Sequence, residues 1–132
     1  GRPLLVASRG FAGIERVLVA FEGSERGRAR LQWVARSPLL AGLEMHLVAV
    51  GDDALRPGLD QALRTLADAG VEASGKLLQG DPQELIGLHA DAVGADLLVM
   101  GAYGRSRIHQ LIMGSTTSAV LRGSRIPVLL LH

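Results

Sequence analysis

The sequence contains no cysteine, which excludes several kinds of site at once. The chain can form no disulfide bond, and it has neither a thiolate nucleophile nor a metal site with sulfur ligands. A chain without cysteine is compatible with the reducing cytoplasm, and we expect a cytoplasmic protein. Histidines are present, but they show no spacing typical of metal ligands. They are His46, His89, His109 and His132.

An excess of charge of one sign is also lacking, and so are long hydrophobic runs. The 14 Lys and Arg residues nearly balance the 13 Asp and Glu residues, which gives a net charge of +1. Such a chain has no general attraction for nucleic acid or for anionic membranes. No apolar run approaches the roughly 20 residues of a membrane-spanning helix, and no signal peptide is recognisable. We therefore expect neither a nucleic-acid partner nor a membrane span.

Aromatic residues make up only 3% of the chain, although 48% of it is hydrophobic, so the core must be built from Leu, Val, Ala and Ile. The length of 132 residues suits one domain. Short apolar runs alternate with segments of helical periodicity. Strands are predicted at residues 16–21, 45–50, 71–80, 96–100 and 127–131. Helices are predicted between them, at residues 22–36, 56–70, 80–94 and 115–122.

This alternation predicts an α/β fold in which a parallel sheet has helices on both faces. The third predicted strand is interrupted by Gly75, which suits an edge position. Asp81 followed by Pro82 predicts the start of the third helix, and Gly70 predicts the end of the second. In such sheets ligands bind outside the carboxyl ends of the strands, where the strand order reverses. The first predicted strand ends in "FEGS" and the fourth in "MGAYG", so these two loops are the candidate walls of a cleft.

Three glycines and a group of hydroxyls follow the fourth predicted strand. Gly101, Gly104 and Gly114 precede Ser115, and Thr117 lies in the predicted helix. Glycine lets a backbone approach a ligand closely, and a helix N-terminus offers unpaired N–H groups to phosphate. The spacing G-x2-G-x9-G-S therefore favours a phosphate site, although turns and a simple helix cap would explain the same residues. It is neither a P-loop nor the Rossmann fingerprint.

Basic residues lie between the second and third glycine. Arg105, Arg107 and His109 follow Gly104 in the sequence. Guanidinium groups there could donate charge-assisted hydrogen bonds to phosphate, and the alternative is a solvated loop.

Three pieces of the sequence together resemble one family. "RVLVAFEGS" begins at residue 16, "ADLLVMGAYGRS" at residue 95 and "GSTTSAVLRGSRIPVLLL" at residue 114. Residues 16–132 as a whole resemble the universal stress protein family, whose nucleotide-binding members carry G-x2-G-x9-G-[ST]. This chain has that motif complete.

The resemblance implies a five-stranded, doubly wound parallel sheet of order 3-2-1-4-5 with helices on both faces. It also implies ATP across the carboxyl ends of the first and fourth strands, with Mg²⁺ as a companion ion left open. Glu22 stands where the family's nucleotide binders usually have Asp, so it is either a ribose or adenine contact or a solvated charge. Phe21 is bulky for its position, and it either lies near the base or fills the core. The residues that the resemblance assigns to the nucleotide are Ala20, Phe21, Glu22, Val50, Met100, Gly101, Gly104, Arg105, Gly114, Ser115 and Thr117.

We expect an ATP-binding stress-response or regulatory domain that acts through nucleotide binding and dimerisation. No nucleophile pattern or general base stands out, and Asp52, Asp53 and Asp81 define no magnesium site, so hydrolysis of ATP is expected to be weak at most. Two alternatives stay open, namely a nucleotide-free interaction module and a slow ATPase.

The N-terminal segment resembles the last predicted strand. "GRPLLVAS" at residue 1 and "RIPVLLLH" at residue 125 both read Arg, Pro and aliphatic residues, which is either coincidence or a remnant of a preceding homologous domain. The chain does not begin with Met. We therefore expect residues 1–15 to be a strand and linker before the domain of residues 16–132, as in the C-terminal half of a tandem member. The apolar last strand is an edge, and the family resemblance implies that it pairs antiparallel with its counterpart across a two-fold axis. Residues 3–7 are therefore predicted to pair with residues 127–131, within one chain or between two.

Overall fold

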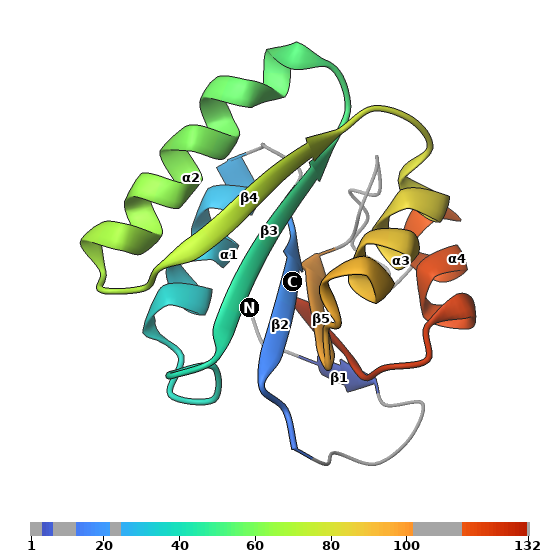
Figure 1. Ribbon diagram of the computed structural model, residues 1–132, viewed down its shortest axis with the longest axis horizontal. Coiled ribbons are helices and arrows are strands. Elements are labelled where there is room, and N and C mark those ends of the chain that lie inside the picture. The colour runs from blue at the N-terminus through green and yellow to red at the C-terminus, as the bar shows by residue number, and fades with distance from the viewer. Residues whose placement is uncertain (1–3, 7–12, 22–24, 102–114, 132) are drawn as a thin grey trace.

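The described part of the chain forms a single sheet with helices on both sides (Figure 1). The computed structural model describes residues 4–6, 13–21, 25–101 and 115–131. In this part the strands are β1 (Leu4–Val6), β2 (Arg16–Ala20), β3 (Glu44–Val50), β4 (Ala73–Leu78), β5 (Leu97–Gly101) and β6 (Val128–Leu131). The helices are α1 (Glu25–Arg36), the 3-10 turn η1 (Asp53–Leu55), α2 (Arg56–Asp68), α3 (Pro82–Val93) and α4 (Ser115–Gly123).

The strand order is β1-β6-β5-β2-β3-β4, and all pairs from β6 to β4 are parallel. Counted from β2, the five parallel strands have the order 3-2-1-4-5, which confirms the predicted fold class. The chain moves outward from β2 through β3 to β4, and then places β5 and β6 on the other side of β2. The strand order therefore reverses between β2 and β5. The interrupted strand β4 is at the edge, as its sequence predicted.

A short antiparallel strand covers the other edge of the parallel sheet. In the register of β1 and β6, Leu4 lies opposite Leu130 and Val6 lies opposite Val128. The predicted pairing is thus confirmed within one chain for residues 4–6 with residues 128–130, while residues 3 and 7 lie outside the described residues. β1 occupies backbone N–H and C=O groups of β6 that an open edge would present to solvent or to another strand.

Aliphatic side chains fill both faces of the sheet, as the scarcity of aromatic residues required. Alternate residues of β2 point to opposite faces, so Val17 and Val19 join one layer while Leu18 and Ala20 join the other. The first layer packs under α1 and α2 through residues such as Leu31, Val34, Leu59 and Leu66. The second packs under α3 and α4 through residues such as Ile86, Ala90 and Val120. Burial on both faces is why the central strands read as continuous apolar runs.

Local signals in the sequence set the ends of the helices. Asp81 caps α3 by accepting a hydrogen bond at Oδ1 from the amide of Gln83 at 3.0 Å, and Pro82 is the first helical residue. Gly94, with φ of 71°, ends α3 in a left-handed conformation that glycine adopts readily. Within the described residues, no helix has the length and apolar character that a membrane crossing needs.

Candidate functional site

Three strands end side by side at one edge of the sheet. β2 ends at Ala20, β3 at Val50 and β5 at Gly101. Because β2 pairs with β3 on one side and with β5 on the other, these ends are neighbours. They surround the point where the strand order reverses, which is where doubly wound sheets bind ligands. The topology therefore brings together the predicted site residues that lie on strands.

The side chains of Ala20, Val50 and Met100 are buried in the layer beneath α3 and α4. Each of them exposes 8% or less of its surface. Two amides at this edge are already used in the protein. The N–H of Phe21 donates to Val48 at 2.8 Å, and that of Gly51 donates to Leu78 at 2.8 Å.

Phe21 packs on the opposite face of the sheet. Its side chain is buried in the layer that includes Leu31, Val34 and Leu59. Its Cε2 atom lies 3.8 Å from the place that a Cβ on Gly58 of α2 would take. Of the two interpretations of this residue, the structure favours a core side chain that joins α1 and α2 to the sheet.

Gly101 lies against a cation that the sequence analysis did not single out. A Cβ placed on Gly101 would fall on the guanidinium group of Arg30, on its Cζ, Nη1 and Nε atoms. Arg30 belongs to α1, its Nε atom is buried, and the residue as a whole is partly buried. The small residue at the end of β5 thus leaves room for a charged side chain of the protein itself. The missed signal was the position of Arg30 on α1, directly before the buried Leu31.

A small cavity of about 20 Å³ lies between α1 and the ends of β2 and β5. It has room for about one water molecule. The residues that line it are Val19, Ala20, Phe21, Arg30, Leu31, Val34, Val99, Met100, Gly101 and Leu131.

The remaining predicted site residues divide into two groups. Glu22, Gly104, Arg105 and Gly114 lie outside the described residues. Ser115 is the first residue of α4, and Thr117 lies in its first turn. The helix predicted from residue 115 therefore begins where the glycine-serine motif ends.

The amino ends of the strands carry a different kind of cluster. Oε2 of Glu44 lies 3.2 Å from Nε of Arg16 and 2.7 Å from Nε2 of His46. The hydrogen bond from His46, together with the charge of Arg16, lowers the pKa of Glu44. Oδ2 of Asp96 accepts hydrogen bonds from the amides of Glu15 at 2.9 Å and Arg16 at 3.0 Å, and these lower its pKa. In the described parts of the chain, no group of three or more His, Asp or Glu residues is arranged to hold a metal ion.

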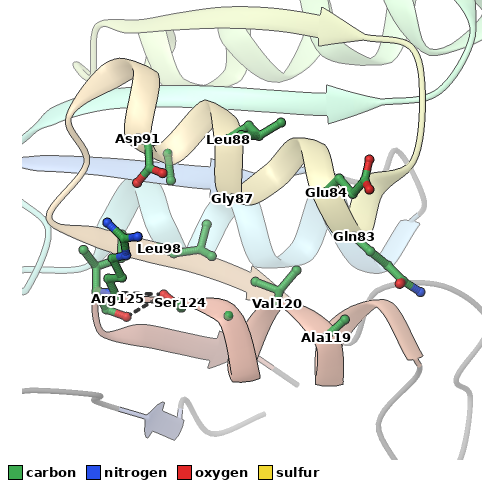
Figure 2. A pocket seen from close by; sticks show the side chains of 13 residues that line it. Gln83, Glu84, Gly87, Leu88, Asp91, Leu98, Ala119, Val120, Ser124 and Arg125 are labelled. Carbon is green, nitrogen blue, oxygen red and sulfur yellow. Dashed lines mark hydrogen bonds between the residues drawn. The ribbon is translucent and has the colours of Figure 1, made fainter.

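A larger hollow of about 470 Å³ lies between α3 and α4 (Figure 2). Leu98, Val120 and Ile126 are among its apolar lining residues. Glu84 and Asp91 of α3 also line it, and Figure 2 shows Asp91 at the same end as Arg125. The lining of this hollow holds two carboxylates and one guanidinium, with Glu84 at the end away from Arg125, so it is a weaker candidate for an anionic ligand than the strand ends. No sequence motif marked it.

Comparisons with known proteins agree on one family. The model of the universal stress protein family matches residues 58–132. The chain is 42% identical over 132 residues to universal stress protein Slr1230 of Synechocystis, covering 97% of this chain and 46% of that protein. A universal stress protein of Thermus aquaticus is 36% identical over 134 residues, covering 88% of this chain and 97% of that protein. For several of the curated relatives, including Slr1230, the match spans only about half of their length.

Solved structures show the same fold. The structure of protein MJ0577 has a TM-score of 0.77 at 23% identity and covers 89% of this chain and 95% of that one. A universal stress protein in complex with cAMP has a TM-score of 0.75 at 24% identity, covering 92% and 98%. The universal stress protein of Archaeoglobus fulgidus in complex with dAMP has a TM-score of 0.69 at 21% identity, covering 91% and 98%. With its sheet order, its family match and these relatives, the chain belongs to the universal stress protein family.

Proposed function

We propose that this domain binds ATP across the carboxyl ends of β2 and β5 and acts in the stress response as a nucleotide-dependent regulatory domain. One observation carries the proposal. Gly101, the first glycine of the motif G-x2-G-x9-G-S, is the last residue of β5, and Ser115, which completes it, is the first residue of α4. The motif thus joins a strand end at the reversal of strand order to the N-terminus of a helix, and both features suit phosphate.

The solved relatives support an adenine nucleotide as the ligand. One was determined with cAMP and another with dAMP, and both molecules contain adenine, a five-membered sugar ring and one phosphate group. ATP has the same three parts and adds two phosphates. The motif G-x2-G-x9-G-S and the N–H groups at the start of α4 offer hydrogen-bond donors for them. Mg²⁺ would accompany the ATP as a counter-ion. We expect little hydrolysis, because no general base has been identified beside the motif.

The predicted residues take separate roles in this proposal. Ala20, Val50 and Met100 form the floor beneath the adenine and ribose, while Gly101 and Gly104 leave room for the ribose and phosphates. Glu22 accepts hydrogen bonds from the ribose or the base. The phosphate contacts are Arg105, Gly114, Ser115 and Thr117.

The small cavity between α1 and the strand ends cannot itself hold a nucleotide, since about 20 Å³ admits only about one water molecule. The proposed ligand therefore lies above the strand ends, outside this cavity. Analysis of freshly purified and denatured protein by liquid chromatography and mass spectrometry tests the proposal. We expect stoichiometric release of an adenine nucleotide, or submillimolar binding of added ATP by calorimetry. The proposal is rejected if the purified protein contains no nucleotide and also fails to bind added ATP, Mg-ATP or AMP.

A second role, association through the last strand, is favoured by the pairing of β1 with β6. The edge of β6 accepts an antiparallel strand, with Leu5 opposite Leu129. The chain also spans only 46% of the length of Slr1230. We propose that the same edge pairs either with a second copy in a homodimer or with a second domain of this kind. Residues 1–15 would be a remnant of such a domain. We also propose that the protein acts in the cytoplasm.

Deletion of residues 1–9 tests this second role. We expect the uncovered edge of β6 to recruit another copy, so the molar mass from light scattering should rise towards that of a dimer. A monomeric mass before and after the deletion, with unchanged amide exchange at residues 127–131, would contradict it.

A further inference from the structure

Arg30 is an unusual residue for the inner side of a helix. It directly precedes Leu31 and lies four residues, about one helical turn, before Val34, and both of these residues of α1 are buried against the sheet. Its guanidinium group extends to the end of β5, where it lies against Gly101. Around it the small cavity is otherwise lined by apolar side chains and by Gly101.

The charge and shape of a guanidinium group in this place limit the kind of ligand that it can bind. Arginine stays protonated at any physiological pH, so its charge cannot be removed by burial. A cation with a buried Nε in apolar surroundings is stabilised by an anion nearby, and the planar group matches the geometry of phosphate. Arg30 already has an interaction partner in this structure, so a ligand phosphate would join or replace that partner.

We propose that Arg30 is an anion contact of the strand-end site, and that it binds a phosphate of the nucleotide beside the end of β5. This inference rests on the proposed function and adds to it a residue outside the glycine-serine motif. It assigns to Gly101 the role of keeping open the space in which the guanidinium lies. It also assigns a specificity to the site, because Arg30 favours nucleotides over the uncharged nucleoside.

Binding of ATP and of adenosine by variants of Arg30, measured by calorimetry on the whole chain, tests the proposal. Arg30→Met keeps the apolar stem of the side chain and removes the charge, and Arg30→Lys keeps the charge but not the planar fork. We expect the Met variant to bind ATP about tenfold or more weakly and adenosine with less than about threefold change, as the loss of a charge-assisted contact implies. The Lys variant should lie between the parent and the Met variant.

Arg36 provides a matched control. It is exposed in the last turn of the same helix and far along α1 from Arg30. Arg36→Met removes the same charge from the same helix and should leave the affinities for ATP and adenosine unchanged. Equal effects of Arg30→Met and Arg36→Met on ATP would show a general charge effect and overturn the proposal.

Gly101→Ala tests whether the place of the guanidinium matters. The added Cβ would collide with the guanidinium, which lies at the flexible end of its side chain and can move away. We expect Gly101→Ala to weaken ATP binding in the parent and to cause little further loss of affinity in the Arg30→Met background. The reason is that the effects of substitutions at two residues in contact are not additive. An equal loss in both backgrounds would contradict the coupling of Arg30 to Gly101 and with it the proposal.

Binding of ATP and adenosine by the parent and by Arg30→Met distinguishes rejection of the Arg30 contact from rejection of the whole nucleotide site. If the parent binds neither ATP nor adenosine, the nucleotide site itself is rejected, and the role of Arg30 falls with it. If the parent binds ATP and Arg30→Met binds it equally well, or loses ATP and adenosine alike, only the phosphate contact is rejected. Thermal melting of each variant separates a binding defect from loss of the fold.

Discussion

The two ends of the parallel sheet carry different kinds of residue. At the amino ends of the strands, charged side chains are held by neighbours in the protein, as Glu44 is by Arg16 and His46. At the carboxyl ends, the strands finish in small or apolar residues such as Ala20 and Gly101, with the guanidinium of Arg30 beside them. The first arrangement satisfies its charges internally and stabilises the fold. The second places a guanidinium group, which already has an interaction partner, beside small residues, and we propose that the phosphate of a ligand joins or replaces that partner.

This difference predicts that changes at the carboxyl ends affect ligand binding, whereas changes at the amino ends affect stability. The largest effect is expected for Gly114→Val, which should abolish binding of ATP because a branched side chain would fill the space beside the phosphates. Calorimetry with ATP measures it.

Gly123→Val is the matched control at the other end of α4. A Cβ on Gly123 would meet nothing within 4 Å, so the substitution should leave ATP binding intact. Unchanged affinity in a folded Gly114→Val protein would remove the motif from the site.

A smaller effect is expected for Glu22→Ala. Loss of a hydrogen bond to a charged acceptor should weaken ATP binding by about 1–2 kcal/mol. Glu44→Ala removes the same charge at the opposite end of the sheet and should leave the affinity for ATP as it is. If the two variants bind ATP equally, Glu22 is a solvated charge and the contrast between the two ends is lost at this residue.

The smallest effect concerns Asp96, which accepts hydrogen bonds from the amides of Glu15 and Arg16. Asp96→Ala removes the acceptor of these hydrogen bonds and should lower the free energy of unfolding by about 1 kcal/mol at neutral pH. The effect is small because this site is partly exposed to solvent. The same substitution should not change ATP binding. Chemical denaturation measures the first effect and calorimetry the second.

The stability that Asp96 contributes should depend on pH in a defined direction. The pKa of Asp96 is lowered in the folded protein by its two backbone hydrogen bonds. The carboxylate therefore stabilises the fold above its ordinary pKa of 3.8, and this contribution is lost as the pH falls through the lower pKa of the folded state. The parent and Asp96→Ala should converge in stability in acid. A constant difference down to pH 2 would contradict this origin.

Much of the fold could be predicted from the sequence, because strands buried on both faces read as short apolar runs. The predicted signals for the start of α3 at Asp81 and for the end of α2 at Gly70 also act locally, through hydrogen bonds and backbone conformation within a few residues. The order of the strands came from the family resemblance instead, since pairing between distant strands leaves little trace in composition or spacing. The pairing of residues 4–6 with the last strand could be predicted because both segments repeat the same aliphatic pattern.

Less of the candidate site could be predicted. The motif correctly located the end of β5 and the start of α4, since glycine and serine mark such boundaries locally. The approach of Arg30 to Gly101 depends on how α1 lies across the sheet, and the two residues are 71 positions apart in the sequence. The hollow between α3 and α4 likewise arises from helix packing and has no sequence motif. Its prediction requires coordinates.

The most direct test of the nucleotide site is a titration of isotope-labelled protein with ATP, followed through the amide signals in NMR spectra. We expect the signals of Ala20, Val50 and Gly101, together with the first turn of α4, to shift in a saturable manner. Those of Arg16 and Asp96, at the opposite end of the sheet, should stay in place. Shifts confined to the amino ends of the strands or to the hollow between α3 and α4, or no saturable shifts at all, would contradict the placement of the nucleotide.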